Sequence, residues 1–320
     1  YGGDNENRLK QEIVLGIGGI RALYALGLKA DIYHSNEGHS AFIGLERLRH
    51  YILEEKLSFE VAKECVRATT LFTTHTPVPA GHDYFTEDML RVYLSHYPER
   101  LKISWNDLVG LGRFVPKNSE EDFSMSVLAA RLSQEMNGVS LLHGIVSQEM
   151  FKGLYPGYLP EENHIGYVTN GVHYETWTAK ELKTLYKNTF GEGFLKDQSN
   201  PEYWRKIHSI PDDQLWNVKI GLKHKLSEYI KERFKYNWIK RFENPRDIVD
   251  IVENFDKTAL TIGFARRFAT YKRANLLFKN LDKLSELVNN EEMPVQFIFA
   301  GKAHPHDGGG QSLIKRIVEI

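Results

Sequence analysis

The order of elements along the first half of the chain constrains its fold most. Short strand-like runs lie at residues 31–33, 69–73 and 165–168, and polar residues follow each run. Helical patterns of apolar residues lie between and beside them, at residues 7–25, 41–53, 59–67, 124–135 and 143–150. Strands that are connected through helices run parallel to one another. The sequence therefore predicts an α/β fold with a mostly parallel sheet.

The second half returns to this order after a long helical connection. Helical patterns dominate residues 179–257, and strand-like runs follow at residues 258–262 and 295–300. Further helical patterns are expected after these strands, at residues 274–288 and 312–320. Because 320 residues exceed the usual size of one domain, we expect two domains, at residues 1–178 and 179–320.

The second of these domains reads as incomplete. Its two strands are too few for an independently stable sheet. The chain also begins with Tyr1, Gly2 and Gly3 and not with methionine. We therefore expect an internal piece of a longer protein, in which the C-terminal domain is cut short.

Composition excludes two classes of partner. The formal net charge is −1 and charged residues make up 26% of the chain, so no overall field favours nucleic acid or an acidic membrane surface. No apolar run approaches the roughly 20 residues that a membrane-spanning helix requires. The single cysteine, Cys65, has no partner for a disulfide and is expected to be a buried, inert thiol in a reducing compartment such as the cytoplasm.

A strongly basic turn predicts an anion site. Arg266, Arg267, Lys272 and Arg273 surround Tyr271 directly after the strand-like run at residues 258–262. Guanidinium groups bind phosphate oxygens in pairs, and a following helix would add the unpaired N–H groups of its first turn. We expect a site for more than one phosphate group. The alternative is a solvated basic surface.

Three loops after strands predict a site for a sugar. Histidine and asparagine occur in the segments at residues 36–39, 74–82 and 170–173. Their neutral donors and acceptors match sugar hydroxyls. The alternative is that these side chains are satisfied surface or core groups.

Other ligand motifs are weaker. His304, His306 and Asp307 could hold a metal ion, but a proline separates the histidines and no third histidine or cysteine is near. The glycines at residues 16–19 follow no strand, which argues against a dinucleotide fingerprint. The pair at residues 301–302 lacks the remainder of a P-loop.

Several segments together resemble one family. They are Asn36-Glu37-Gly38-His39, Thr74-His75-Thr76, Thr169-Asn170-Gly171-Val172-His173, Arg266-Arg267-Phe268-Ala269-Thr270-Tyr271-Lys272-Arg273 and Phe299-Ala300-Gly301-Lys302-Ala303. In this order they resemble the signature segments of the α-glucan (glycogen, starch and maltodextrin) phosphorylases, and more closely the shorter prokaryotic branch than the muscle type. The resemblance implies two Rossmann-like domains facing across a cleft, the glycosyltransferase B-type architecture.

The resemblance also implies an activity and a cofactor. Inorganic phosphate would attack the terminal α-1,4-linked glucose of a glucan with retention, giving glucose 1-phosphate, and pyridoxal 5'-phosphate would be the cofactor. The lysine that carries this cofactor lies in a Gly-Thr-Ser-x-x-Lys segment in the family, and no such segment occurs here. We therefore expect the chain by itself to be inactive. The sequence leaves open whether the protein forms a homo-oligomer.

The resemblance assigns roles to the basic turn. It implies that Arg267 binds substrate phosphate, that Arg266 takes the place of the family's cofactor-phosphate lysine, and that Lys272 stands between the two anions. Ala269 and Thr270 replace a His-Glu pair of the muscle type, so contacts of that pair are not carried over.

Sugar contacts follow from the same resemblance. It implies that Tyr271 and His75 contact the glucosyl unit, and that Asn36 and His39 line the glucose pocket. Two other functions stay open: a sugar-nucleotide-dependent transferase similar to glycogen or starch synthase, and a non-catalytic glucan-binding protein.

Overall fold

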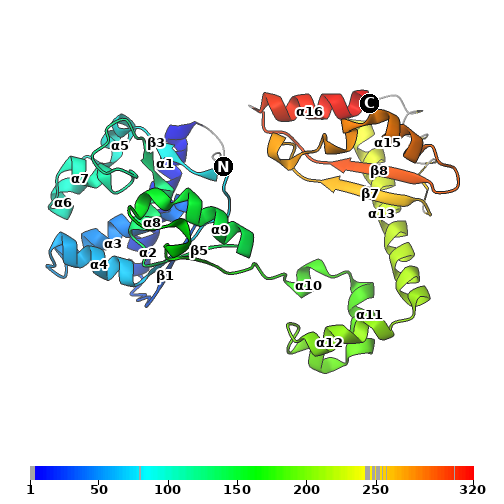
Figure 1. Cartoon of the computed structure of the whole chain (residues 1–320), viewed down its shortest axis with the longest axis horizontal. Helices are drawn as coiled ribbons and strands as arrows, with labels where there is room; N and C mark the ends of the chain where they lie inside the picture. The colour runs from blue at the N-terminus through cyan, green and yellow to red at the C-terminus, as the bar shows by residue number, and fades with distance from the viewer. Residues whose placement is uncertain are drawn as a thin grey trace. The chain divides into compact units, whose positions relative to one another are not determined.

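The computed structural model describes residues 4–78, 81–241, 246, 249, 253, 255, 256, 258–305 and 307–320. Its contacts divide the chain into two compact units, residues 1–172 and 173–320, which are described separately below (Figure 1). The expected domain boundary between residues 178 and 179 stays a prediction.

A four-stranded parallel sheet organises the first unit. Its strands follow the order β1-β2-β5-β6, with bounds β1 Tyr33–Asn36, β2 Thr70–Thr73, β5 Glu135–Gly138 and β6 Ile165–Tyr167. All three pairings are parallel. The prediction of a mostly parallel sheet is confirmed. A short antiparallel pair, β3 Tyr84–Phe85 with β4 Phe123–Ser124, was not predicted.

Helices connect these strands. Their bounds are α1 Asn5–Ile13, α2 Gly19–Ala25, α3 Phe42–Leu53, α4 Phe59–Ala68, α5 Glu87–Leu94, α6 Tyr97–Leu101, α7 Trp105–Gly110, α8 Met125–Arg131 and α9 Leu141–Met150. A π-helical turn, η1 Val14–Gly18, joins α1 to α2, and the short 3-10 helices are η2 Gly38–Ser40, η4 Lys152–Leu154 and η5 Pro160–Glu162. Helix α9 packs against β5 and β6, the two strands at one edge of the sheet.

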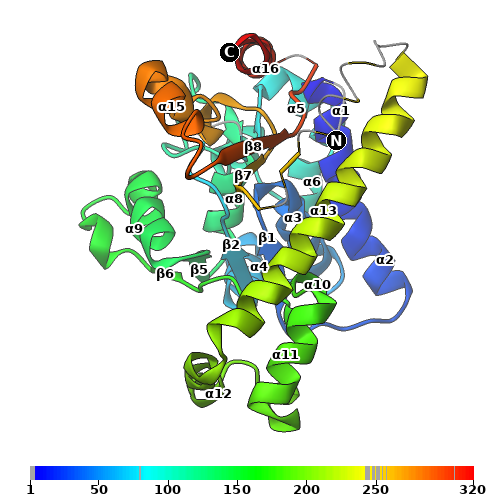
Figure 2. The same cartoon turned by 90° about the vertical axis from the view of Figure 1, so that its right-hand side faces the viewer.

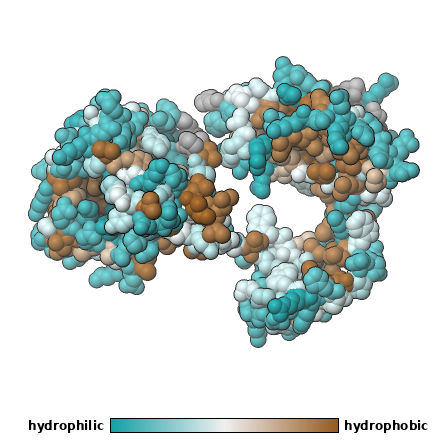
Figure 3. All heavy atoms as spheres, in the orientation of Figure 1, coloured by the Kyte–Doolittle hydropathy of each residue, from teal (hydrophilic) through white to brown (hydrophobic). Residues whose placement is uncertain are grey.

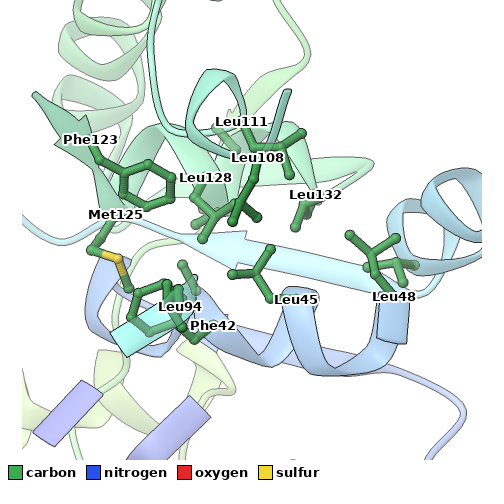
Figure 4. Close-up of a cluster of buried hydrophobic side chains, with 14 of the residues drawn as sticks. Phe42, Leu45, Leu48, Leu94, Leu108, Leu111, Phe123, Met125, Leu128 and Leu132 are labelled. Atoms are coloured by element: carbon green, nitrogen blue, oxygen red, sulfur yellow. The ribbon is translucent and has the colours of Figure 1, made fainter. Parts of the chain in front are cut away.

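Apolar side chains from several of these helices form the core of the first unit. Figure 4 shows the cluster in which Phe42 and Leu45 of α3 lie near Leu128 of α8. Helices α3 and α8 pack so closely that a Cβ atom on Gly44 would lie 2.5 Å from the Leu132 side chain. Figure 3 also shows hydrophobic residues on the surface. Among the exposed large hydrophobic side chains are Leu142 of α9 and Val168 after β6, which are 71% and 65% exposed.

Two sequence predictions for this sheet were wrong in their bounds. The first strand was expected at residues 31–33, but β1 begins at Tyr33 and includes the polar side chains up to Asn36. The helix expected at residues 124–135 ends at Arg131, and β5 occupies residues that were predicted to be a helix end and a loop. Strand β1 forms because β2 pairs with its backbone, and β5 forms because β6 does. The polar side chains of β1 and β5 do not reveal these pairings in the sequence.

The second unit begins with helices and 3-10 turns. Their bounds are α10 Tyr174–Trp177, α11 Lys180–Phe190, η6 Glu192–Leu195, α12 Pro201–Arg205, η7 Lys206–Ser209 and α13 Asp212–Arg241. Tyr174, Phe190 and Phe194 form a small aromatic core there. Helix α13 confirms part of the helical pattern that was predicted over residues 179–257 (Figure 2).

Two parallel strands follow in the second unit. They are β7 Leu260–Ala265 and β8 Val295–Ala300, paired in register from Leu260 with Val295 to Ala265 with Ala300. Around them lie η8 Thr270–Lys272, η9 Leu276–Lys279, α15 Leu281–Val288 and α16 Gly308–Glu319. The α-helix expected from residue 274 was wrong in its start, because α15 begins at Leu281, capped by the side chain of Asn280.

Two expectations from composition concern membranes and the cysteine. In the part of the chain that the structure describes, no helix has the length and apolar character to cross a bilayer. Cys65 forms no disulfide. The expectation that it is buried was wrong, because its side chain is only half-buried. It lies on α4, of which only Ala62 and Val66 are buried, so one side of this helix faces the core.

Candidate functional site

Two predicted sugar-binding residues are joined at the carboxyl ends of neighbouring strands. Asn36 ends β1, and His75 follows β2 by two residues. Because Asn36 pairs with Thr73 in the sheet, the two segments leave it side by side. The Nε2 atom of His75 hydrogen-bonds Oδ1 of Asn36. A carboxamide oxygen only accepts, so this ring nitrogen carries the proton and Nδ1 is left as the acceptor.

Glu37 lies between these residues, and the sequence predictions gave it no role. Its carboxylate accepts hydrogen bonds from the backbone N–H groups of His75 and Gly38. Its backbone has a φ of 72°, which is uncommon for any residue except glycine. The sequence signal was a carboxylate within the Asn-Glu-Gly-His segment, but the backbone conformation is visible only in the structure.

His39 lies in η2 beside a small cavity. The cavity has a volume of about 170 Å³ and is lined by His39, Arg8, Gln11, Glu12 and Leu15. Burial lowers the pKa of His39 from its ordinary value, and the nearby positive charge of Arg8 adds to this effect. His39 therefore favours the neutral form, which can both donate and accept hydrogen bonds.

Glu12 is a buried carboxyl group in the same cavity. It is 1% exposed, and burial, together with the neighbouring Asp83, raises its pKa to about 9. Arg8 contacts both carboxyl groups, at 2.7 Å from Glu12 and 2.8 Å from Asp83. Arg8 lowers the pKa of Glu12 by less than burial and Asp83 raise it, so Glu12 favours its protonated form at neutral pH.

The loop after β2 is held by its last histidine. Nε2 of His82 lies 2.8 Å from the carbonyl oxygen of Thr76, and Nδ1 lies 2.7 Å from Oγ of Ser126. Because a carbonyl oxygen only accepts, Nε2 carries the proton and Ser126 donates to Nδ1. This histidine closes the loop, and Pro79 and Ala80 within it are outside the described residues.

The third predicted loop has other hydrogen bonds. The N–H group of Asn170 donates to the carbonyl oxygen of Val139, 3.2 Å away. Nδ1 of His173 lies 2.7 Å from Oγ1 of Thr176. The described hydrogen bonds thus join the first two loops, at residues 36–39 and 74–82, and leave the third apart.

His143 is a further residue at this edge of the sheet that the sequence predictions left without a role. It lies near the start of α9 and is 8% exposed. Its Nδ1 accepts from the N–H group of Val139, while Nε2 is buried and has no hydrogen-bond partner among the described residues. Burial lowers the pKa of this imidazole, so it stays neutral. In the sequence, only the position of His143 shortly after the segment that forms β5 could have indicated a role in the site.

The basic turn of the second unit is built around a buried phenylalanine. Phe268 is 4% exposed, its ring lies 5.5 Å from that of Phe264, and its N–H group donates to the carbonyl oxygen of Lys302. Gly301 permits this arrangement, since a Cβ atom there would lie 2.2 Å from the carbonyl oxygen of Arg266. The backbone around the cations is therefore fixed by packing against the end of β8.

Most of the predicted phosphate residues line one open pocket. It has a volume of about 710 Å³ and is lined by Gly263, Phe264, Ala265, Arg266, Tyr271, Lys272 and Arg273. The Lys272 ammonium lies 4.7 Å from the centre of the Tyr271 ring. Arg267 is exposed but does not line this pocket.

The cations of the turn have no acidic partners among the residues that the structure describes. Within the described part of the chain, Arg266, Arg267, Lys272 and Arg273 form no ion pair, and all four are exposed. Four unpaired positive charges within eight residues attract an anion. The expected contribution of an α-helix N-terminus was wrong, because the turn leads into the 3-10 helix η8 and Arg273 has a left-handed backbone.

The metal alternative gains no support from the residues that can be inspected. His306 is outside the described residues. Asp307 caps α16 by accepting a hydrogen bond from the N–H group of Gly310. No group of three or more candidate metal ligands occurs among the described residues.

A larger cavity lies elsewhere in the first unit. Its volume is about 1100 Å³, and its lining includes Arg67, Arg131 and Tyr155. None of the residues predicted from the sequence lines it.

Comparison with known proteins decides the family. A profile of the family described as carbohydrate phosphorylase matches residues 27–320. The chain belongs to the carbohydrate phosphorylase family. The α/β architecture with parallel sheets agrees with the glycosyltransferase B-type fold of the phosphorylases.

Curated relatives of this phosphorylase chain extend the match over its whole length. A glycogen phosphorylase of Mycobacterium tuberculosis is 41% identical over 100% of the chain and 38% of that relative. A maltodextrin phosphorylase of Thermococcus litoralis is 40% identical, with 100% and 37% covered. The human liver glycogen phosphorylase is 24% identical, with 89% and 34% covered. The chain thus spans a little over a third of the length of these relatives.

Proposed function

We propose that the full-length protein phosphorolyses the terminal α-1,4-linked glucose of glycogen or maltodextrin to glucose 1-phosphate. The observation that carries this proposal is the turn at residues 266–273, whose four cations lack acidic partners among the described residues. Membership of the carbohydrate phosphorylase family and the names of the relatives support it.

The basic turn would bind the anions of the reaction. Arg267 offers two N–H groups to the substrate phosphate, and Lys272 supplies a mobile point charge beside it. Two phosphate groups side by side repel, by about 4 kcal/mol for unit charges 4 Å apart near a protein surface. Unpaired cations offset this repulsion, whereas cations already paired with carboxylates would not.

The same residues fit a phosphate-bearing cofactor. Arg266 and Lys272 line an open pocket and are free of ion pairs within the described residues, so they would hold the phosphate of pyridoxal 5'-phosphate. When bound, this cofactor would supply a phosphate that donates and recovers a proton. The lysine that attaches it would come from the rest of the full-length protein.

The loops of the first unit would bind the glucosyl unit. Nδ1 of His75 would contact a sugar hydroxyl, while Asn36 holds the ring at Nε2. Neutral His39 can either donate a hydrogen bond to a sugar hydroxyl or accept one from it. The resemblance to the family also gives Tyr271 a sugar contact, for which its phenolic hydroxyl is suited.

Product analysis tests the proposal. The full-length protein, loaded with its cofactor, is incubated with maltodextrin with and without inorganic phosphate, and the released sugars are separated. We expect glucose 1-phosphate only when phosphate is present. Release of free glucose without phosphate would indicate hydrolysis, a requirement for a sugar nucleotide would indicate a synthase-like transferase, and binding without turnover would indicate a glucan-binding protein.

The setting of this reaction is part of the proposal. Glycogen and phosphate are both cytoplasmic metabolites, and a half-buried cysteine without a disulfide is compatible with a reducing compartment. We propose that the protein acts in the cytoplasm.

A further inference from the structure

Glu37 has a backbone conformation that glycine favours. Its φ of 72° and ψ of 167° lie in a region that is populated almost only by glycine, because a Cβ atom makes it strained. Gly38 follows directly, yet the strained position itself carries a long side chain. A glycine at residue 37 would remove the strain, so the presence of glutamate requires a gain from its side chain.

The surrounding hydrogen bonds impose this conformation. The N–H group of Glu37 donates to the carbonyl oxygen of Thr73, 2.9 Å away, which continues the pairing of β1 with β2. Its carbonyl oxygen accepts from Oγ of Ser40, 3.0 Å away, and from Oγ of Ser35. The backbone is therefore held at both ends, and the direction of the side chain is fixed.

That direction places the carboxylate between two loops. One oxygen accepts from the N–H group of His75 in the loop after β2, and the other accepts from the N–H group of Gly38, 3.3 Å away. Hydrogen bonds from backbone N–H groups to a charged acceptor are about twice as strong as those between neutral groups. His75 is thus held twice, at its backbone by Glu37 and at its imidazole by Asn36.

We propose that Glu37 is a positioning residue, which uses its strained backbone to fix the imidazole of His75 in the orientation that binds the glucosyl unit. The proposal rests on the proposed function, because it concerns the same sugar site. Glu37 acts through His75 and need not contact the substrate. The backbone strain at Glu37 then serves to orient His75 and does not stabilise the fold.

A double-mutant cycle in the full-length protein tests this relationship. Glu37→Gln keeps one acceptor oxygen, removes the charge, and should lower kcat roughly ten- to a hundredfold, as expected for loss of a hydrogen bond to a charged group. In the His75→Ala background no imidazole needs positioning, so the same substitution should change kcat less than about threefold. Equal factors in both backgrounds would overturn the proposal.

Binding provides a second measurement that is independent of turnover. The same four proteins are titrated with maltopentaose by calorimetry, and the factor by which Glu37→Gln weakens binding is compared in the two backgrounds. We expect a clear loss with His75 present and little change without it. A wild-type protein that binds maltopentaose but releases no glucose 1-phosphate would contradict the proposed function alone, and this binding cycle would still decide the role of Glu37.

Stability separates positioning from a structural role. Glu37→Gly removes both the strain and the carboxylate, so its thermal midpoint should stay the same or rise while kcat falls. Lys102→Gly is the matched control, because Lys102 also has a positive φ, of 56°, at the end of α6. This control should raise the thermal midpoint and leave kcat unchanged. A Glu37→Gly variant that loses thermal stability, or that retains wild-type kcat, would refute the proposal.

Discussion

The imidazole of His75 is hydrogen-bonded to the carboxamide of Asn36, across the ends of two adjacent parallel strands. Neither side chain is buried, so the contact depends on the sheet register and not on enclosure by a core. The contact also selects the tautomer of His75, with its proton on Nε2. Removal of Asn36 should therefore affect the direction of the ring and the position of its proton together.

Substitution of Asn36 should reduce sugar binding moderately. In the full-length protein, Asn36→Ala removes one hydrogen bond, worth about 0.5–1.5 kcal/mol, and should lower kcat/KM for maltodextrin roughly 2- to 13-fold. The change should appear mainly in the glucan dependence of the rate and not in the phosphate dependence. Asn106→Ala is the control, since Asn106 is an exposed asparagine of the same unit in α7. An equal effect of both substitutions would remove the role of Asn36.

Two adjacent arginines should differ in what they bind. Arg267→Ala should raise the phosphate concentration that gives half-maximal rate about 10- to 100-fold, because charge-assisted hydrogen bonds are worth roughly 1.5–3 kcal/mol. Arg267→Lys should recover only part of this loss, since an ammonium cannot reproduce a bidentate contact. Arg266→Ala should instead reduce cofactor content after purification, which absorbance of the cofactor measures.

Tyr271 and Arg316 serve as controls for this assignment. Tyr271→Phe removes one neutral hydrogen bond and should leave the phosphate dependence nearly unchanged. Arg316→Ala, at an exposed position on α16, should change neither phosphate dependence nor cofactor content. Arg266 lines the pocket and Arg267 does not. If Arg266→Ala raises the phosphate requirement and Arg267→Ala lowers the cofactor content, substrate phosphate is assigned to Arg266 instead.

The sequence predicted the sheet from its apolar strands and misjudged its polar ones. Strand β8 has the predicted bounds, Val295–Ala300, because five of its six side chains are apolar. Strands β1 and β5 carry histidine, serine, asparagine or glutamate, and they form because neighbouring backbones pair with them. Pairing between distant segments is not encoded in local periodicity.

The candidate site residues were predicted from their side-chain chemistry, whereas Glu37, His143 and Glu12 stand out only through features of the folded structure. Histidine, asparagine and arginine after strands can be recognised in a sequence because these residue types have hydrogen-bonding or charged groups that suit sugars and phosphates. Glu37 is notable only for its backbone angle, and His143 only for its burial. Glu12 belongs to a helix whose other residues form an ordinary amphipathic pattern. Its raised pKa arises mainly from burial, to which the neighbouring Asp83 adds, and both come from the fold.

The raised pKa of Glu12 predicts a pH dependence of stability. Its pKa rises from 4.5 to about 9 on folding, mainly through burial, so the folded state holds a proton that the unfolded state releases. The contribution of Glu12 to the free energy of unfolding is fully present below pH 4.5 and is lost as the pH rises to about 9. At about 1.4 kcal/mol per pKa unit, the loss is at most about 6 kcal/mol.

Glu12→Gln tests this dependence because it replaces the neutral acid by a neutral amide of nearly the same shape. The thermal midpoints of wild type and Glu12→Gln should be similar at pH 5, and the wild type should become the less stable of the two as the pH approaches 9. Glu6→Gln is a suitable control, since Glu6 lies on the exposed side of the same helix. A constant difference between wild type and Glu12→Gln at every pH would show that Glu12 keeps an ordinary pKa.

A methyl group at Gly301 should displace the backbone of the basic turn. The added Cβ atom would lie 2.2 Å from the carbonyl oxygen of Arg266 and 3.0 Å from the ring of Phe268, so the backbone must move. Gly301→Ala should therefore lower stability by about 1–3 kcal/mol, as overpacking does, and should also raise the phosphate concentration for half-maximal rate. Gly308→Ala is the matched control, because a Cβ atom there meets no atom within 4 Å. If both variants show wild-type phosphate dependence in the full-length protein, the backbone position of the turn does not govern phosphate binding, and the turn contributes through its net charge alone.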